Sequence, residues 1–581
     1  MNEKLLEPLK YYETKGKNEH NDNVNAYFDT LVATSKVDVE ANRATVKKYN
    51  NELNNIKKIE GKISKYKAFR ILSIIGIILA AVAFIVGVTF VSTNTGMGLG
   101  LILGGAALIV LFILLIVKKI NPLLKQTQEI LDKHKKKAWE LRTEAENQMA
   151  PLNALFDERD TFNLIEKTLP EMDFEGSFTT EQEELFKKHY DFFDLNNKDS
   201  SMVNTLSGKL EGNPFLFCQC LKHELKSATY HGSLVISWTE TYRDSDGKTR
   251  TRRRTQTLHA SVTKPKPYYH LNNYLVYGNQ AAPDLTFSRS PQVSDKMDDK
   301  DIDKKVKKGK KKLVKQAQKA LKKGGHFQEM ANEEFDVLFG AINRDHEVQF
   351  RLMYTPLGQT NTVDLIRSDS GYGDDFYFTK QKKCNIITSN HAQKWDMDTS
   401  PSKYYSYDID IARQKFVDFN NGYFKSVFFD FAPLLCVPAY LEERCASLET
   451  PDAFKSNYTY YEHETIANLL DRRELLPEEA INNAILKTSL VEKLDGEDLV
   501  SVCANGYTTM EHIDYIPVRG GDGRIHGVPV QWTEYIPIQG VRNIYVSHSG
   551  MSKKDYTARL DADNGLNGTT YSHGLLAKFA N

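Results

Sequence analysis

Two long stretches without a charged residue constrain this chain more than any other feature of its sequence. They cover residues 71–91 and 97–117, and each has 21 residues. A helix needs about 20 apolar residues to cross the ~30 Å hydrocarbon core of a bilayer. Residues 92–96 leave room only for a turn, so we expect a transmembrane hairpin of two antiparallel helices. A buried helical hairpin in a soluble core is the alternative.

Basic residues lie on the outer flanks of the two stretches and are absent from the turn between them. They are Lys62, Lys65, Lys67, Arg70, Lys118, Lys119 and Lys125. The positive-inside rule then predicts an integral protein of the plasma membrane with both termini in the cytoplasm. The first stretch begins at residue 71, which is too far along the chain for a secretory signal peptide.

Small residues recur four apart within both stretches. Gly100 and Gly104 form such a pair in the second stretch, and Ala83 and Gly87 form one in the first. Small side chains let helices approach closely in lipid, so we expect these pairs to pack the two spans together. Contact between chains in a homo-oligomer is the alternative. Neither stretch contains a charge, which argues against an ion path through the hairpin alone.

The polar segments beside the two stretches show the three-and-four spacing of a heptad repeat. The later stripe contains Ile120, Leu124, Thr127, Leu131, His134, Ala138, Leu141 and Ala145, and the earlier one contains Val46, Tyr49, Leu53, Ile56, Ile59, Ile63 and Tyr66. We expect antiparallel coiled-coil arms at 36–70 and 118–150, with Pro151 ending the second arm. Residues 1–35 form a polar lead-in. His134 is expected to be a tolerated stripe residue and not a ligand.

Length and charge bound the rest of the chain. Its 581 residues are too many for one core, and its 76 basic and 76 acidic residues balance, which disfavours a nucleic-acid partner. Six cysteines cannot form a disulfide framework and agree with a reducing compartment. We expect a cytosolic α+β domain at 151–450, with a lysine-rich insertion at 304–323, and a C-terminal domain at 451–581 that is helical and then β-rich.

Antiparallel strands are the main signal in this cytosolic part. Residues 233–242 alternate, residues 244–247 form a turn signal, and residues 249–263 are the return strand. Strand patterns recur at 376–389 and 500–581, with a glycine-rich hairpin turn at 520–523. We predict helices at 346–366, 404–438, 462–473 and 477–494. The predicted fold class is therefore α+β, with a transmembrane hairpin and coiled-coil arms before a mixed region rich in antiparallel strands.

Two basic segments are candidates for binding anionic lipid headgroups or an acidic partner. Arg250, Arg252 and Arg254 share one face of the return strand; a solvated outer face near Glu240 is the alternative. Residues 304–323 hold eleven lysines and no acid. We expect a helix here, with a narrow apolar stripe that contains Leu313, Ala317, Ala320 and Leu321. The predicted contact residues are Lys307, Lys308, Lys310, Lys311, Lys312, Lys315 and Lys319. A charged insertion between two strands is the alternative here.

The sequence contains no recognised motif for a reaction, a metal or a cofactor. His463 begins a zincin-like pattern, but Ala467 stands where the second histidine is required. Residue 561 begins a calcium-like loop whose last ligand is missing. Cys218 and Cys220 share one strand face while His223 points to the other, so core cysteines are the preferred interpretation. We expect no catalytic residue, no metal site and no cofactor.

One resemblance adds to this interpretation. The segments YHGSLVISWTETYRDSDGKTRTRRR and NEEFDVLFGAINRDHEVQFRLMYTPLGQTN, within residues 230–290 and 332–366, resemble an uncharacterised bacterial family. The resemblance implies a two-span membrane protein with coiled-coil arms and a cytosolic α+β domain of unknown function, and it carries over no site residue. We expect a membrane-anchored scaffold that binds an unidentified protein. A tethered hydrolase-like enzyme and an accessory subunit of a transport or pore complex are the alternatives.

Overall fold

The computed structural model falls into two compact units. It describes residues 5–90, 95–192, 195–243, 245–325, 327–369, 371–394, 396–442, 458–481, 483–494, 496–548, 555–556, 559, 568–572 and 574–580. The first unit comprises Met1–Val24, Asp157–Ser400 and Asn420–Asn581, and the second comprises Asn25–Phe156 and Pro401–Phe419. Two helices begin in one unit and end in the other. They are α2 (Lys17–Ser35) and α12 (Ile409–Leu435).

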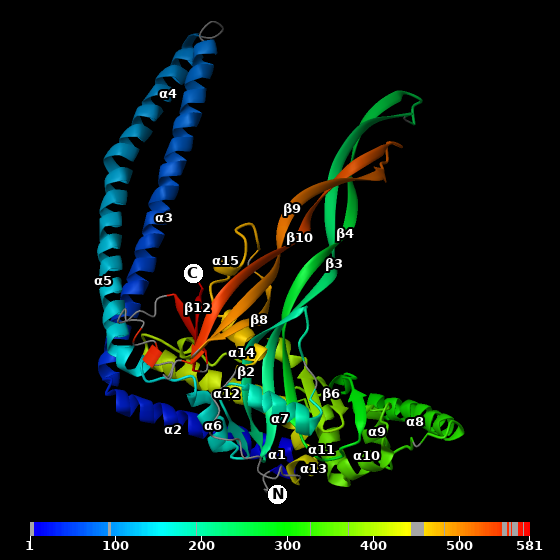
Figure 1. The fold of residues 1–581 in the computed structure, drawn as a ribbon. Coiled ribbons are helices and arrows are strands. Elements are labelled where there is room, and N and C mark those ends of the chain that lie inside the picture. The colour runs from blue at the N-terminus through cyan, green and yellow to red at the C-terminus, as the bar shows by residue number, and fades with distance from the viewer. Residues whose placement is uncertain are drawn as a thin grey trace. The chain divides into compact units, whose positions relative to one another are not determined.

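Three helices form most of the second unit. They are α3 (Val39–Phe90), α4 (Thr95–Leu115) and α5 (Asn121–Asn153), with the π-helical turn η3 (Ile116–Ile120) between the last two. Helix α3 packs along both α4 and α5 (Figure 1). Pro151 does not end α5, contrary to the prediction, because a proline in the last turn removes few helical hydrogen bonds. Most of the predicted external turn, residues 91–94, lies outside the described residues.

The apolar parts of these helices are mainly exposed in the structure. Only 17% of the most apolar window of the first helix is buried, and only 6% of that of the second. The core helices of a soluble protein would instead be mostly buried. By length and composition, both helices can cross a membrane.

Gly87, a predicted contact residue, and Gly105, which was not predicted, lie where α3 and α4 approach most closely. A Cβ added to Gly105 would lie 2.9 Å from the carbonyl oxygen of Ala80, and one on Gly87 would lie 2.9 Å from Cβ of Leu101. A Cβ on Gly100 or Gly104 would meet no described atom within 4 Å. The prediction for Gly100 and Gly104 was therefore wrong, because these two residues lie on the face of α4 that does not contact α3.

The two predicted stripes meet where α3 packs on α5. Their buried members include Tyr49, Ile56, Ile63, Leu131 and Ala138. Among them lies the carboxylate of Glu52, whose oxygens are 2.6 Å from Nδ1 of His134 and 2.8 Å from Nζ of Lys137. His134 therefore holds a specific polar contact between the helices, which the heptad pattern alone did not predict.

Two antiparallel sheets organise the first unit. The seven-stranded sheet has the order β1-β2-β3-β4-β7-β6-β5, and the five-stranded sheet has the order β11-β12-β10-β9-β8. The strands are β1 (Met172–Phe174), β2 (Ser200–Leu210), β3 (Asn213–Arg243), β4 (Thr249–Gly278), β5 (Thr286–Arg289), β6 (Phe376–Gln381), β7 (Cys384–Ser389), β8 (Ile485–Leu494), β9 (Glu497–Arg519), β10 (Ile525–His548), β11 (Thr569–Ser572) and β12 (Leu575–Phe579). The antiparallel α+β class is thus confirmed.

Short helices surround these sheets. They are α1 (Pro8–Tyr11), α6 (Asp160–Thr168), α7 (Thr180–Tyr190), α8 (Asp299–Lys322), α9 (Glu333–Phe339), α10 (Glu347–Met353), α11 (Pro356–Arg367), α13 (Pro438–Glu442), α14 (Tyr460–Ala467) and α15 (Arg472–Leu475). The predicted helix at 346–366 is two helices, because Thr355 caps a new one ahead of Pro356. The predicted helix at 477–494 was wrong. Its second half is β8, which pairs with β9 and buries Ile485 and Leu486.

Two long hairpins, β3–β4 and β9–β10, extend side by side from the sheets (Figure 1). Ile236, Leu258 and Val528 form a buried cluster between them. The backbones come so close that a Cβ on Gly232 would lie 2.0 Å from the carbonyl oxygen of Pro529. This contact allows only glycine at position 232.

The N-terminal segment completes the first unit. Tyr12 stacks on Phe428, with 4.7 Å between the ring centroids. The buried ring of His20 lies between two partners, with Nδ1 3.0 Å from Oγ1 of Thr168 and Nε2 3.3 Å from the carbonyl oxygen of Asn420. The first 24 residues therefore pack against parts of the chain that are synthesised much later.

Candidate anion-binding surface

Helix α8 contains most of the lysine-rich segment, and its ends explain why it is helical. The side chain of Asp298 caps the first turn by accepting a hydrogen bond from the amide of Asp301 at 2.8 Å. Acidic residues occupy the first turn, and Lys319 and Lys322 occupy the last turn. This order of charges matches the helix dipole. The predicted helix is confirmed.

The apolar side of α8 is occupied by α9. Ile302 and Leu313 are buried, and a Cβ on Gly309 would lie 2.5 Å from Cγ1 of Val337 on α9. Leu321, which the sequence placed in the same stripe, is 79% exposed. The stripe therefore anchors the N-terminal half of α8 to the protein and leaves the last turn projecting into solvent.

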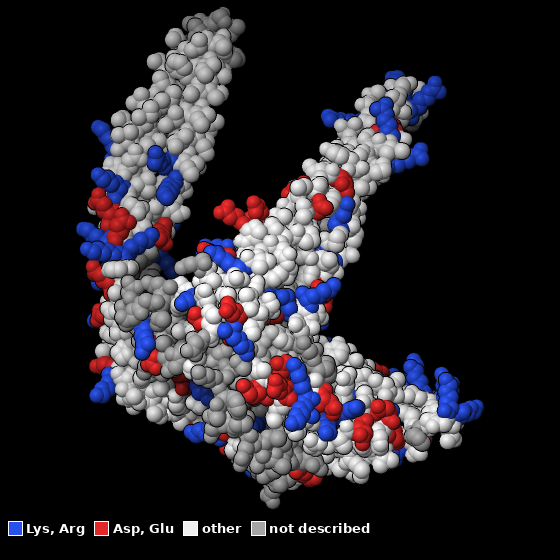
Figure 2. All heavy atoms as spheres, in the orientation of Figure 1, with Lys and Arg blue, Asp and Glu red and all other residues white. Residues whose placement is uncertain are grey.

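The lysines of this segment divide into two groups. Lys304 pairs with Asp301, Lys310 pairs with Glu333, and Lys305 donates to the carbonyl oxygen of Gln292. Eight further lysines are exposed and have no hydrogen-bond or ion-pair partner among the described residues. These are Lys307, Lys308, Lys311, Lys312, Lys315, Lys319, Lys322 and Lys323. Figure 2 shows the resulting positive cluster at the end of α8. Lys310, one of the predicted contact residues, already forms an ion pair with Glu333.

The predicted arginines lie on a separate element, near the tip of the β3–β4 hairpin (Figure 2). Arg254 Nε is 2.7 Å from a carboxylate oxygen of Glu240, and Arg252 Nη2 is 3.7 Å from the same oxygen. Arg250 also has interactions within the protein. The carboxylate of Glu240 thus offsets part of the charge of two arginines. Fewer unpaired cations are therefore available to a ligand here than on α8.

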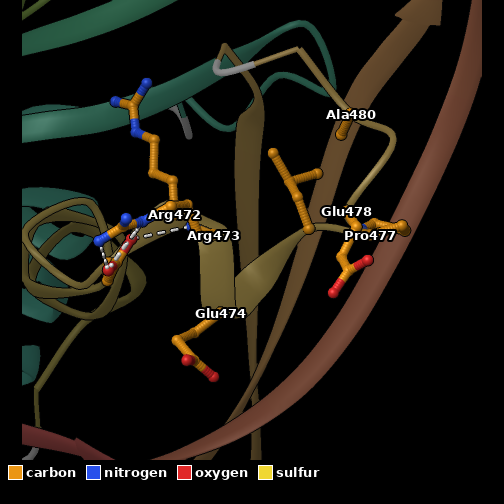
Figure 3. A pocket seen from close by; sticks show the side chains of 8 residues that line it. Arg472, Arg473, Glu474, Pro477, Glu478 and Ala480 are labelled. Carbon is orange, nitrogen blue, oxygen red and sulfur yellow. Dashed lines mark hydrogen bonds and ion pairs between the residues drawn. The ribbon is translucent and has the colours of Figure 1, made fainter.

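A hollow of about 620 Å³ lies beside α15 and the loop that follows it. Arg472 and Arg473 line one side, and Pro477, Glu478 and Ala480 line the other (Figure 3). No sequence pattern predicts this hollow, since Arg472 belongs to no motif.

Helix α14 lies buried against both sheets and carries two buried carboxyl groups. One oxygen of Glu462 accepts the amide of Phe178 at 2.7 Å, while the other is buried without a hydrogen bond. Burial raises the pKa of Glu462 to about 8, and the hydrogen bond from Phe178 offsets this only in part. Glu464 instead pairs with Nζ of Lys487 at 2.6 Å and accepts the amide of Met202.

A buried histidine lies between two acids elsewhere in the first unit. His391 Nδ1 is 2.8 Å from Asp375, and Nε2 is 3.4 Å from Asp430. Burial alone would lower the pKa of His391, but Asp430 and Asp375 outweigh it and raise the pKa to about 10. Tyr372 stacks on the imidazole at 3.9 Å. A histidine that stays charged at neutral pH serves here as a structural cation and not as a general base.

The side chains considered as metal ligands are separated in the structure. Cys218 and Cys220 are buried in an apolar cluster, and Nε2 of His223 is 3.1 Å from the hydroxyl of Tyr507. His463 pairs with Asp498 at 3.2 Å. Within the described residues, no three His, Cys, Asp or Glu side chains are placed to hold a metal ion. Residues 561–567, the first part of the calcium-like loop, lie outside these residues, and its last positions form β11.

Comparisons with family models, with curated proteins and with solved structures find no match to this chain. The resemblance to a bacterial two-span family therefore stays a prediction.

Proposed function

We propose that this protein is a membrane-anchored scaffold that binds anionic lipid headgroups through α8. The apolar lengths of α3 and α4 would cross the bilayer, and the remainder of α3 and α5 would form a coiled-coil stalk on the cytoplasmic side. The exposure of both apolar windows supports the anchor. The Glu52 contact with His134 and Lys137 supports a fixed register between the stalk helices.

The eight exposed, unpartnered lysines of residues 307–323 carry the proposal. Because α9 covers the apolar side of α8, this helix cannot insert that side into lipid. It would therefore act as a charged surface, with Leu321 as its one large exposed apolar side chain. Each basic residue near an anionic membrane contributes about 1 kcal/mol at low salt. Eight such lysines favour an anionic lipid surface as the ligand of α8 over a single acidic side chain of a protein.

The test uses the full chain in nanodiscs of neutral lipid and in nanodiscs that contain anionic lipid. Mass spectrometry measures how fast each lysine is acetylated. We expect the lysines at 311–323 to be acetylated more slowly beside anionic lipid, because contact with headgroups shields the amines and raises their protonation. High salt should remove the difference by screening.

Two internal controls accompany this measurement. Lys304, which pairs with Asp301, should change little, and so should Lys264, which lies 3.8 Å from the Trp532 ring on the long hairpins. Equal acetylation of the α8 lysines in both lipids at low salt would overturn the lipid assignment. It would leave an acidic protein partner as the remaining reading of this surface.

A further inference from the structure

The hollow beside α15 is lined by two charged side chains that form no ion pair with the described residues, Arg472 and Glu478. Three ion-pairing groups around it are already used. Arg473 forms two contacts to Asp471, of 3.0 and 2.6 Å, and Glu474 pairs with Arg542 at 2.5 Å. Figure 3 shows the Arg473 pair as dashed lines. Arg472 has no hydrogen-bond or ion-pair partner among the described residues.

The surroundings of Arg472 make this unusual. Its side chain is half-buried, and burial lowers the pKa of its guanidinium while nearby Tyr269 raises it. An arginine that loses water normally gains a carboxylate or several carbonyl oxygens in exchange. Here Arg472 lines a hollow of about 620 Å³ instead.

A second unsatisfied group lies within electrostatic range of Arg472. The hydroxyl of Tyr269 is buried and makes no hydrogen bond to any residue that the structure describes. Arg472 and Tyr507 both influence its pKa, which burial raises to about 12. Tyr269 therefore stays a neutral donor over the physiological pH range. A ring-to-ring distance of 5.2 Å places His223 beside Tyr269.

The backbone around the hollow supports a formed site and not a chance gap. The loop after α15 is fixed to the five-stranded sheet, because the amide of Ile481 donates to the carbonyl oxygen of Tyr507 at 2.8 Å. A Cβ on Gly540 would lie 2.2 Å from the carbonyl oxygen of Leu475. Glycine at position 540 thus lets α15 lie directly on β10.

We propose that this hollow binds a small oxyanion, a carboxylate or a phosphate, through the guanidinium of Arg472. The planar guanidinium can donate two parallel N–H groups to two oxygens of such a ligand. The site is independent of the lysine surface of α8, so either proposal can fail alone.

Calorimetric titration of the full chain in detergent tests this site with inorganic phosphate and with acetate as separate probes. We expect one of the two to bind at a single site. Arg472→Gln should weaken binding by about tenfold to a hundredfold, the range of a charge-assisted hydrogen bond. Binding of phosphate but not acetate would assign the phosphate class, and the converse would assign the carboxylate class.

Two further variants keep the test informative if Arg472→Gln folds poorly. Glu478 also lines the hollow, so Glu478→Gln removes a like charge and should tighten binding of the anion. The paired variant Lys310→Gln with Glu333→Gln removes an ion pair of α8 and α9, outside the lining of the hollow, and should leave binding unchanged. The proposal is overturned if neither probe binds. It is also overturned if a probe binds equally well to the wild type, to Arg472→Gln and to Glu478→Gln.

Discussion

Glu462 offers the sharpest test of how the buried face of α14 contributes to stability. Its carboxyl group is fully buried, has one hydrogen bond from Phe178, and has a pKa raised to about 8 from an ordinary value near 4.5. At pH 7 the folded protein therefore holds this group protonated, while the unfolded chain ionises it. Glu462→Gln keeps the shape and the acceptor for Phe178 but cannot ionise.

The sign follows from linkage. A folded pKa above the unfolded one gives stability that is complete below about pH 4.5 and is lost as the pH rises toward 8. Each pH unit in that window costs the wild type about 1.4 kcal/mol, so between pH 5 and pH 8 the loss is about 4 kcal/mol. The Gln variant escapes this loss. Its advantage in free energy of unfolding should be small at pH 5 and largest at pH 8.

Denaturant unfolding of both proteins in detergent, followed by tryptophan fluorescence at several pH values, measures this difference. Glu464→Gln is the matched control on the same helix. It removes a carboxylate that pairs with Lys487 and should destabilise the fold by roughly 3 kcal/mol at pH 7. A pH-independent difference between the wild type and Glu462→Gln would refute the reasoning, because it would mean that Glu462 ionises normally inside the fold.

Three other substitutions test the packing. Hydrogen bonds from Lys137 and His134 lower the pKa of Glu52 to about 2. Glu52→Gln should therefore lower the free energy of unfolding by roughly 1 kcal/mol at pH 7 and by nothing near pH 2. Urea unfolding at the two pH values measures this difference. Gly232→Ala should cost about 1–3 kcal/mol by the same assay, because it forces apart the two long hairpins, while Gly422→Ala, which has open space, should not destabilise. Gly105→Leu should lower the melting temperature in detergent, whereas Gly104→Leu, which faces away from α3, should leave it unchanged. Equal effects of the last two would contradict the observed helix face.

Local sequence patterns predicted the parts of the fold whose secondary structure depends mainly on residues that are neighbours in the sequence. The alternation at 233–242 and its turn signal predicted the β3–β4 hairpin, because one residue in two meets solvent there. They did not predict its length, since residues 215–220 near the start of β3 are buried on both faces and lose the alternation. The segment 485–494 was assigned to a helix because its pairing with β9 is a tertiary interaction that overrides weak local preference.

The same limit applies to the candidate sites. A run of lysines is visible in any sequence, and the helix and its unpaired charges followed from it. Which lysines are neutralised depended on Glu333 and Gln292, which only the fold brings near. The hollow at Arg472 is further from prediction, because its lining residues belong to no motif and only contacts with the five-stranded sheet fix the loop that follows α15. Spacing likewise placed Gly100 and Gly104 against the first span, and only packing shows that α3 contacts the face of α4 that contains Gly105.

The contacts of the N-terminal segment impose an order on biosynthesis. His20 meets the backbone of Asn420, which leaves the ribosome 400 residues later. At 5–20 residues per second, the nascent chain must keep its first helices without their final partners for roughly 20–80 seconds. Aromatic groups such as Tyr12 are uncovered throughout that interval, so the early chain is a natural client for chaperones until translation is nearly complete.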